Sequence, residues 1–162
     1  WHGVRNNVAK LGIDIMPYYW FTVTKELSEP QRIKDETLDL KVSIFGESEI
    51  KIIKSKIIGI EQKDLLDDLK NGEICIGLKD NDDIVAYSFI RWKSFYVRKR
   101  YFDLGEEDIY IHSTYVFDKY RGKNIAPYLN YQRFEFMEKE GVKYHHLISE
   151  YFNKSAVRML KL

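Results

Sequence analysis

Residues 108–126 read DIYIHSTYVFDKYRGKNIA and join two segments of different hydrophobic period. Apolar and polar residues alternate from Asp108 to Phe117, which predicts a strand. Helical spacing follows from about Lys123 to Glu140, and Gly141 supplies a cap. The first N–H groups of a helix have no internal acceptors and carry the positive end of its dipole. This strand-to-helix junction is therefore expected to bind phosphate.

The junction also carries local positive charge. Gly122 lets the backbone approach a ligand closely. Arg121 can donate two parallel hydrogen bonds to phosphate oxygens, and Lys123 adds a point charge. The chain as a whole has no such excess, because 26 Lys and Arg face 25 Asp and Glu and leave a formal charge of +1. Any anion site must be local, and this combination suits a pyrophosphate.

Weaker patterns on both sides extend the alternation of strands and helices. The segments 108–117 and 144–149, joined by the long helix, should be parallel neighbours. The strands around the polar turn 79–83 should form an antiparallel hairpin. The other expected elements are strands over 40–44 and within 50–60, a helix over 61–69 stopped by Asn71-Gly72, hairpin strands over 73–78 and 84–92, and a helix starting at Asn153.

The chain reads as one domain over residues 40–162 preceded by an aromatic arm over residues 1–39. In the arm, an extended aromatic segment from Met16 to Phe21 follows a short predicted helix that carries apolar residues at helical spacing, namely Val4, Val8, Leu11 and Ile15. Such a stretch must pack on something, either on the domain itself or on a second subunit in a homodimer.

Composition argues against several classes of protein. A single cysteine, Cys75, excludes an internal disulfide framework and fits a reducing compartment. No apolar stretch approaches the roughly 20 residues of a membrane span, and the first residues lack the pattern of a signal peptide, so a cytoplasmic location is expected. Nucleic-acid binding through Lys93 and residues 98–100 is an alternative, which the balanced charge argues against.

The segment Tyr120-Arg121-Gly122-Lys123-Asn124-Ile125-Ala126 resembles the phosphate loop of the GNAT superfamily of acetyl-CoA-dependent N-acyltransferases, Gln/Arg-x-x-Gly-x-Gly/Ala. Arg121 and Ala126 match this pattern, and Asn124 stands where glycine is usual. The resemblance extends to Thr114-Tyr115-Val116 and to Asn153-Lys154-Ser155-Ala156. It implies a mixed α/β fold, in which helices flank a twisted sheet with antiparallel N-terminal strands and a parallel, splayed strand pair.

The resemblance also implies acetyl-CoA as cosubstrate. Asn124 would take either a left-handed or an ordinary helical conformation in the loop. In relatives the strand before the loop offers main-chain groups to the pantetheine arm, and an asparagine after the next strand lies beside it. The residues implied for the cofactor are Thr114, Val116, Arg121, Gly122, Lys123, Asn124, Ile125, Ala126 and Asn153.

Relatives usually continue with two further strands that wall the acceptor pocket, whereas this sequence stops at Leu162. The domain is therefore expected to lack its C-terminal strands, either because the chain is cut or because a partner chain supplies them. The tyrosine that relatives often use as general acid falls at the position of Leu160. Tyr110, Tyr151 or solvent would have to replace it.

Strand alternation predicts the catalytic candidates. It places Asp108, Tyr110, His112, Thr114 and Val116 on one face of the strand. His112 suits a general base, acting directly or through water, and the alternative is a histidine hydrogen-bonded within a packed sheet. Glu150, at the end of the next strand, is a second candidate. No metal is expected, because His145 and His146 are adjacent strand residues and point to opposite faces.

These features predict an enzyme that transfers acetyl from acetyl-CoA to a primary amine of a small molecule. The arm, from Leu11 to Trp20, resembles acetyltransferases associated with surface-polysaccharide synthesis, which implies an amino sugar or a nucleotide-linked amino sugar as acceptor. The alternative is a non-catalytic sensor or assembly module that binds acyl-CoA on the same fold.

Overall fold

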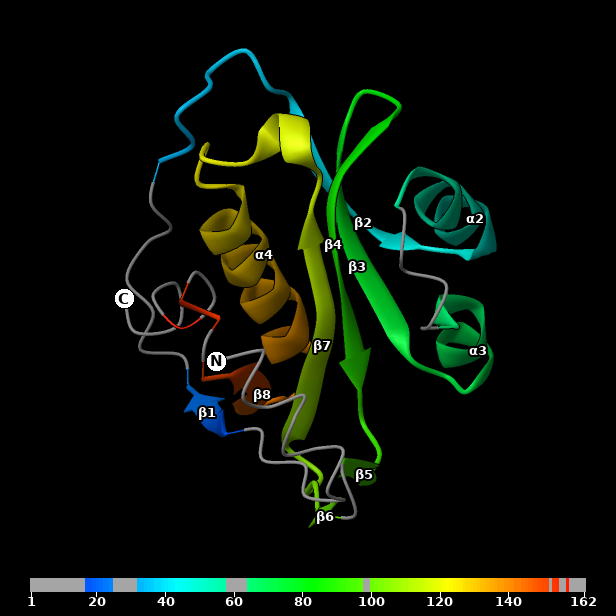
Figure 1. Ribbon diagram of the computed structural model, residues 1–162, viewed down its shortest axis with the longest axis vertical. Coiled ribbons are helices and arrows are strands. Elements are labelled where there is room, and N and C mark those ends of the chain that lie inside the picture. The colour runs from blue at the N-terminus through cyan, green and yellow to red at the C-terminus, as the bar shows by residue number, and fades with distance from the viewer. Residues whose placement is uncertain are drawn as a thin grey trace, which may run out of the picture.

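The computed structural model describes residues 17–24, 32–57, 64–97, 100–151, 153–154 and 157. Within these ranges a six-stranded mixed sheet in the order β1-β8-β7-β4-β3-β2 has helices on both faces (Figure 1). Its elements are β1 (Tyr18–Val23), β2 (Leu40–Phe45), α2 (Glu47–Lys56), α3 (Leu65–Lys70), β3 (Ile74–Asp80), β4 (Asp83–Arg91), β7 (Asp108–Val116), the 3₁₀ turn η2 (Asp118–Tyr120), α4 (Ile125–Lys139) and β8 (Tyr144–Glu150). A separate ribbon pairs β5 (Phe95–Val97) with β6 (Arg100–Phe102).

Strand directions confirm the expected mixed sheet. The strands β2, β3, β4 and β7 pair antiparallel in succession, and β7 pairs parallel with β8. The arm supplies the sixth strand, because β1 runs antiparallel along the outer edge of β8, from Tyr18 opposite Glu150 to Val23 opposite His145. The aromatic segment of the arm is therefore part of the sheet. The helix expected from Val4 to Ile15 lies outside the described residues.

Two apolar clusters hold the helices on opposite faces of the sheet. Under α4, Leu129 and Met137 pack with strand residues that include Ile109. Under α2 and α3, Ile53 and Leu65 pack with a second set of strand residues. These five side chains are buried. Burying one such side chain contributes about 1.5–3 kcal/mol to the free energy of unfolding. The sheet is therefore packed against helices on both faces.

The strand expected within residues 50–60 is wrong, because residues 47–56 form helix α2. Ile50 and Ile53 lie three positions apart and are both fully buried, which is helical spacing. The helix begins after Gly46, whose N–H donates to the Glu49 carboxylate at 3.0 Å. A short apolar run cannot be assigned to strand or helix from its composition alone, and here the buried spacing decided it.

The other helix boundaries follow local sequence signals. α3 begins after Asp64, whose carboxylate accepts from the N–H groups of Leu66 and Asp67, and it ends before Gly72, where φ is +85°. α4 ends before Gly141, where φ is +84°. None of the helices among the described residues has the length and apolar character needed to span a bilayer.

Candidate active site

The two parallel strands separate partway along their length. β7 and β8 are in register only from Asp108 opposite Tyr144 to Ile111 opposite Leu147, although β7 continues to Val116 and β8 to Glu150. Beyond Ile111 the edge of β7 that faces β8 is no longer paired with it. The expected splay is therefore present, and Thr114 and Val116 lie on the separated part of β7.

A tight loop connects this separated strand to α4. Gly122 has a φ of +76°, and Asn124, the residue before the first helical position, has a φ of +63°. Asn124 thus takes the left-handed conformation, one of the two that the sequence left open, and asparagine tolerates it better than most residues. The N–H groups of Ile125 and Ala126 follow in the first turn of α4, where no intrahelical acceptor exists. The backbone there is arranged to receive an anion.

Both cations of the loop have carboxylate partners. Arg121 lies 2.9 Å from Asp118, and its Nε donates to the carbonyl oxygen of Val116 at 3.1 Å. Lys123 lies 2.7 Å from Asp35. Hydrogen bonds from Lys123 and then from Thr37 lower the pKa of Asp35 to about 2. An incoming phosphate would compete with these carboxylates for Arg121 and Lys123.

The arm also contacts the loop through its backbone. The Asn124 side chain donates to the carbonyl oxygen of Arg32 at 2.9 Å, and the Lys34 N–H donates to the carbonyl oxygen of Lys123 at 3.2 Å. With the Lys123–Asp35 pair, three contacts tie residues 32–35 to residues 123 and 124. Sequence reasoning missed this contact, since nothing local to either segment signals it.

A bulge in β7 overturns the expected alternation. Phe89 of β4 is in register with His112 and Tyr87 with Tyr115, so one residue of β4 faces both Ser113 and Thr114. Ser113 has a φ of +51°, which is uncommon for a residue with a side chain. The extra residue shifts every later side chain of the strand to the other face.

The shift separates residues that the alternation had grouped together. Thr114 faces α4, because its hydroxyl lies 2.9 Å from that of Ser88, to which Arg133 of α4 also donates. His112 faces the α3 side, where its ring lies 5.6 Å from that of Phe89 in the cluster under α2 and α3. The expectation that His112 shares a face with Thr114 and Val116 is therefore wrong, and the reason is the bulge.

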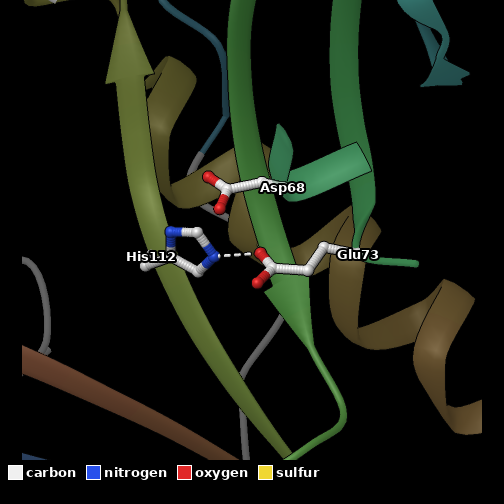
Figure 2. A group of neighbouring side chains, drawn as sticks. All are labelled: Asp68, Glu73 and His112. Carbon is white, nitrogen blue, oxygen red and sulfur yellow. Dashed lines mark hydrogen bonds and ion pairs between the residues drawn. The ribbon is translucent and has the colours of Figure 1, made fainter. Parts of the chain in front are cut away.

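His112 sits in a polar cluster built from three parts of the chain. Its Nε2 lies 2.5 Å from the Glu73 carboxylate, and its Nδ1 lies 3.0 Å from the Ser113 hydroxyl. Figure 2 shows His112 on β7 directed at Glu73, which stands just before β3, with Asp68 of α3 beside them. The His112 side chain is only 13% exposed. It is a hydrogen-bonded histidine in a packed sheet, with both ring nitrogens engaged.

Arg91 keeps Glu73 charged. Its Nε donates to Glu73 at 2.5 Å, and its guanidinium lies 3.8 Å from Asp68. Burial raises the pKa of Glu73, but hydrogen bonds from His112 and Arg91 outweigh this and hold the pKa below its ordinary value. An ionised carboxylate only accepts hydrogen bonds, so a neutral His112 must carry its hydrogen on Nε2. Nδ1 then accepts from Ser113.

Tyr110 joins His112 on the same face. The two rings stack 5.7 Å apart, and Phe95 stacks on Tyr110 at 4.1 Å. Trp20 of β1 lies parallel to Tyr110 at 6.3 Å. Burial raises the pKa of Tyr110 to about 12, so its phenol stays protonated and can donate. The structure thus brings together two of the three catalytic candidates, beside an aromatic ring of the arm.

The third candidate lies elsewhere. Glu150 is exposed at the end of β8, three positions past the last residue paired with β7, and is in register with Tyr18. Asn153 follows it, and its N–H donates to the carbonyl oxygen of Glu150 at 2.9 Å. Ala156 and Leu160 lie outside the described residues.

Two groups of side chains have residue types that can bind a metal. His145 stacks on Phe134 of α4, whereas His146 stacks on Trp20, so the two histidines face opposite sides as expected. Among the described residues, Asp68, Glu73 and His112 have ligand atoms within 4.8 Å of one another. These types can bind a divalent cation, but Arg91 already supplies a positive charge to both carboxylates.

Sequence reasoning therefore missed Glu73, Arg91 and Asp68. Glu73 follows a helix stop and opens a strand, a position where a charged residue ordinarily faces water. No local pattern marks it as the partner of a histidine 39 positions away. The contact depends on the packing of β3, β4 and β7.

Comparison with known proteins places this geometry in context. Residues 44–162 match the model of the acetyltransferase (GNAT) family. No curated protein matches the sequence. The fold is similar to that of a functionally unknown conserved protein from Staphylococcus epidermidis, with a TM-score of 0.59 and 12% identity, covering 95% of this chain and 60% of that chain.

A second solved structure, from Novosphingobium aromaticivorans, is described as an acetyltransferase of the GNAT family. It has a TM-score of 0.54 and 13% identity, covering 99% of this chain and 74% of that one. At such identities the likeness to both structures concerns the fold alone.

Proposed function

The chain belongs to the acetyltransferase (GNAT) family, and on that premise we propose that it transfers an acetyl group from acetyl-CoA directly to a primary amine of a small molecule. The observation that carries the proposal is the separation of β7 from β8 beside the left-handed loop at Gly122 and Asn124. An extended thioester arm and a pyrophosphate need these two features next to each other.

The separated strand fits the pantetheine arm. The Phe117 N–H donates to the carbonyl oxygen of Val85 on β4 at 3.0 Å, so strand alternation directs the N–H of Val116 toward the opposite edge, where β8 has moved away. Main-chain groups of Thr114 and Val116 can therefore pair with the arm as a neighbouring strand would. The Val116 N–H can also polarise the thioester carbonyl.

The loop fits the pyrophosphate. The N–H groups from Gly122 to Ala126 lie at the start of α4, and Arg121 and Lys123 add positive charge. Asn153, just after β8, supplies a contact to the pantetheine from the other side of the separation. The donor is held by these residues, and the acetyl group lies at the separated part of β7.

Transfer requires the amine to lose a proton and the departing thiolate to gain one. His112, backed by Glu73, serves as the base, and Tyr110 is a protonated donor on the same face. The acceptor approaches from the α3 side, where Trp20 stacks on His146 at 4.9 Å and the ribbon of β5 and β6 adds further rings. Aromatic walls with a few polar groups suit a small acceptor, for which we propose an amino sugar or a nucleotide-linked amino sugar.

The first test is calorimetric titration with acetyl-CoA. Arg121→Ala should weaken binding by about tenfold or more, because charge-assisted hydrogen bonds to phosphate are lost. Arg100→Ala, on the exposed β6, is the matched control and should bind as the wild type does. Desulfo-CoA and CoA fragments without phosphates would locate the contact.

Turnover completes the test. A screen of amines that includes amino sugars should yield an acceptor, and His112→Ala should lower kcat by about 10²-fold or more with acetyl-CoA affinity unchanged. A wild type that does not bind acetyl-CoA contradicts the proposal. Binding without turnover of any amine would instead favour an acyl-CoA sensor on the same fold.

A further inference from the structure

The hydrogen bonds of His112 restrict how it can act as a base. Glu73, held ionised by Arg91, accepts from Nε2, so the lone pair of the neutral ring lies on Nδ1. That lone pair faces the Ser113 hydroxyl at 3.0 Å. The basic atom of His112 is therefore Nδ1, and its partner is a hydroxyl.

Neighbouring rings enclose the imidazole. Tyr110 stacks on it at 5.7 Å with an interplanar angle of 10°, and Phe89 lies 5.6 Å away. With 13% of the side chain exposed, there is little room for an acceptor amine to reach the ring directly. The route outward from Nδ1 leads through the Ser113 hydroxyl.

Ser113 stands at the place where chemistry is expected. It lies two residues beyond Ile111, the last residue of β7 in register with β8, and so at the start of the separation. Its φ of +51° costs about 1–3 kcal/mol for a residue other than glycine. Strain of this kind persists where the surrounding structure enforces it, and it concentrates at functional sites.

Resting on the proposed acetyl transfer, we propose that the Ser113 hydroxyl relays the proton from the acceptor amine to Nδ1 of His112. As the amine nitrogen bonds to the thioester carbonyl carbon and the carbon–sulfur bond breaks, Ser113 takes the amine proton and passes its own to His112. The CoA thiolate leaves with the electron pair and takes a proton from the Tyr110 phenol, which regains one from solvent. Glu73 is a positioning residue, which fixes the tautomer and stabilises the imidazolium.

The charges around the relay suit this role. Glu73 and Asp68 carry two negative charges and Arg91 one positive charge, so the cluster with a neutral His112 is net negative by one. Uptake of a proton brings the cluster to neutrality. Asp68 of α3 and Glu73, just before β3, lie beside the ring on β7, and Arg91 of β4 pairs with both carboxylates.

The test uses two variants that differ in backbone strain. Ser113→Ala and Ser113→Gly both remove the hydroxyl, but glycine also relieves the left-handed strain. Both should lower kcat by about 10²-fold with acetyl-CoA affinity unchanged. Both should recover part of their activity as the pH is raised, because hydroxide can then take the proton of the attacking amine in place of the relay. Ser43→Ala, on the edge strand β2, is the control and should retain wild-type turnover.

A purely structural Ser113 predicts a different pattern. Glycine would then match or exceed the wild type, and that result overturns the relay. Wild-type kcat and an unchanged pH profile in both variants would do the same. An acetyl group found on Ser113 by mass spectrometry of the intact protein would also overturn it, by making the hydroxyl a nucleophile.

One readout does not depend on turnover. Nitrogen-15 NMR of His112 reports its tautomer, and the relay requires hydrogen on Nε2 of the neutral ring. Hydrogen on Nδ1 overturns the relay even if the protein is an active acetyltransferase. Failure of the proposed function is separate, because it shows as absent acetyl-CoA binding whatever the tautomer.

Discussion

Lys123 and Asp35 lie 88 positions apart in the sequence and form an ion pair of 2.7 Å between the loop before α4 and the arm. The Lys34 N–H and the Lys123 carbonyl oxygen add a backbone hydrogen bond at the same place. The arm thus contributes both to the sheet, through β1, and to the surroundings of the loop. A carboxylate beside the proposed phosphate site would oppose binding of the ligand.

Asp35→Asn should tighten acetyl-CoA binding several-fold at low salt. The change removes the carboxylate charge that pairs with Lys123, so the lysine ammonium is available to phosphate. Titration at two salt concentrations measures the effect, which should shrink at the higher one. Glu36→Gln is the control, because Glu36 pairs with Arg32 and not with the loop. Weaker binding by Asp35→Asn would show that Asp35 instead holds Lys123 in place.

Substitutions at Asn124 should separate its backbone role from its side-chain role. Asn124→Ala replaces asparagine with a residue that tolerates the left-handed region less well, and it loses the hydrogen bond to the Arg32 carbonyl oxygen. The free energy of unfolding should therefore fall by about 1–2 kcal/mol. Asn124→Gly loses only the hydrogen bond, so its free energy of unfolding should fall by less. Urea unfolding measures both, and an alanine variant as stable as the glycine variant would contradict a backbone role.

Arg133 is expected to contribute to acetyl-CoA binding but to lower the free energy of unfolding. It is fully buried, donates to Ser88 at 3.3 Å, and has an Nε without a hydrogen-bond partner. Burial lowers its pKa to about 9. Because a buried cation is costly, Arg133→Met should raise the free energy of unfolding by about 1 kcal/mol.

The same change should weaken acetyl-CoA binding, since Ser88 connects Arg133 to Thr114 on the separated strand. Urea unfolding and calorimetry report the two effects. Arg133→Lys keeps the charge and should not gain stability. A large fall in the free energy of unfolding in Arg133→Met would instead show that Arg133 stabilises the packed core.

Glu73 should make stability depend on pH. Its pKa is lowered in the folded state, so its contribution is complete above the ordinary glutamate pKa of about 4.3 and is lost as the pH falls through the lower folded value. The difference in unfolding free energy between wild type and Glu73→Gln should therefore be largest near neutral pH and shrink in acid. Arg91, His112 and Asp68 are the groups that face it.

Urea titrations across this pH range provide the measurement. Glu140→Gln, which removes an exposed carboxylate at the end of α4, is the control for a general charge effect. A difference that grows on acidification would contradict the assignment.

Much of the fold could be read from the sequence, because its strongest signals are local. The strand at 108–116, the helix at 125–139 and the stops at Gly72 and Gly141 depend on periodicity and on residues that accept positive φ. The sequence did not predict α2, because its isoleucines have helical spacing but also form an apolar run typical of a strand. The sequence did not predict the ribbon of β5 and β6 either, because its two strands have only three residues each.

The candidate site was predictable only in part. Motif and residue type made the loop residues and His112 candidates, but they did not predict the face that His112 occupies. A single bulge at Ser113 reverses the alternation, and nothing in the residue types of β7 marks where the extra residue falls.

The sequence by itself determined the strand, loop and helix from Asp108 to Lys139, since these elements form from interactions between near neighbours in the chain. Only the tertiary structure decided that Glu73 holds His112, that Asp35 reaches Lys123, and that β1 lies on the edge of β8. Such contacts join residues tens of positions apart. They depend on strand register and side-chain packing across the whole sheet, which no local pattern encodes.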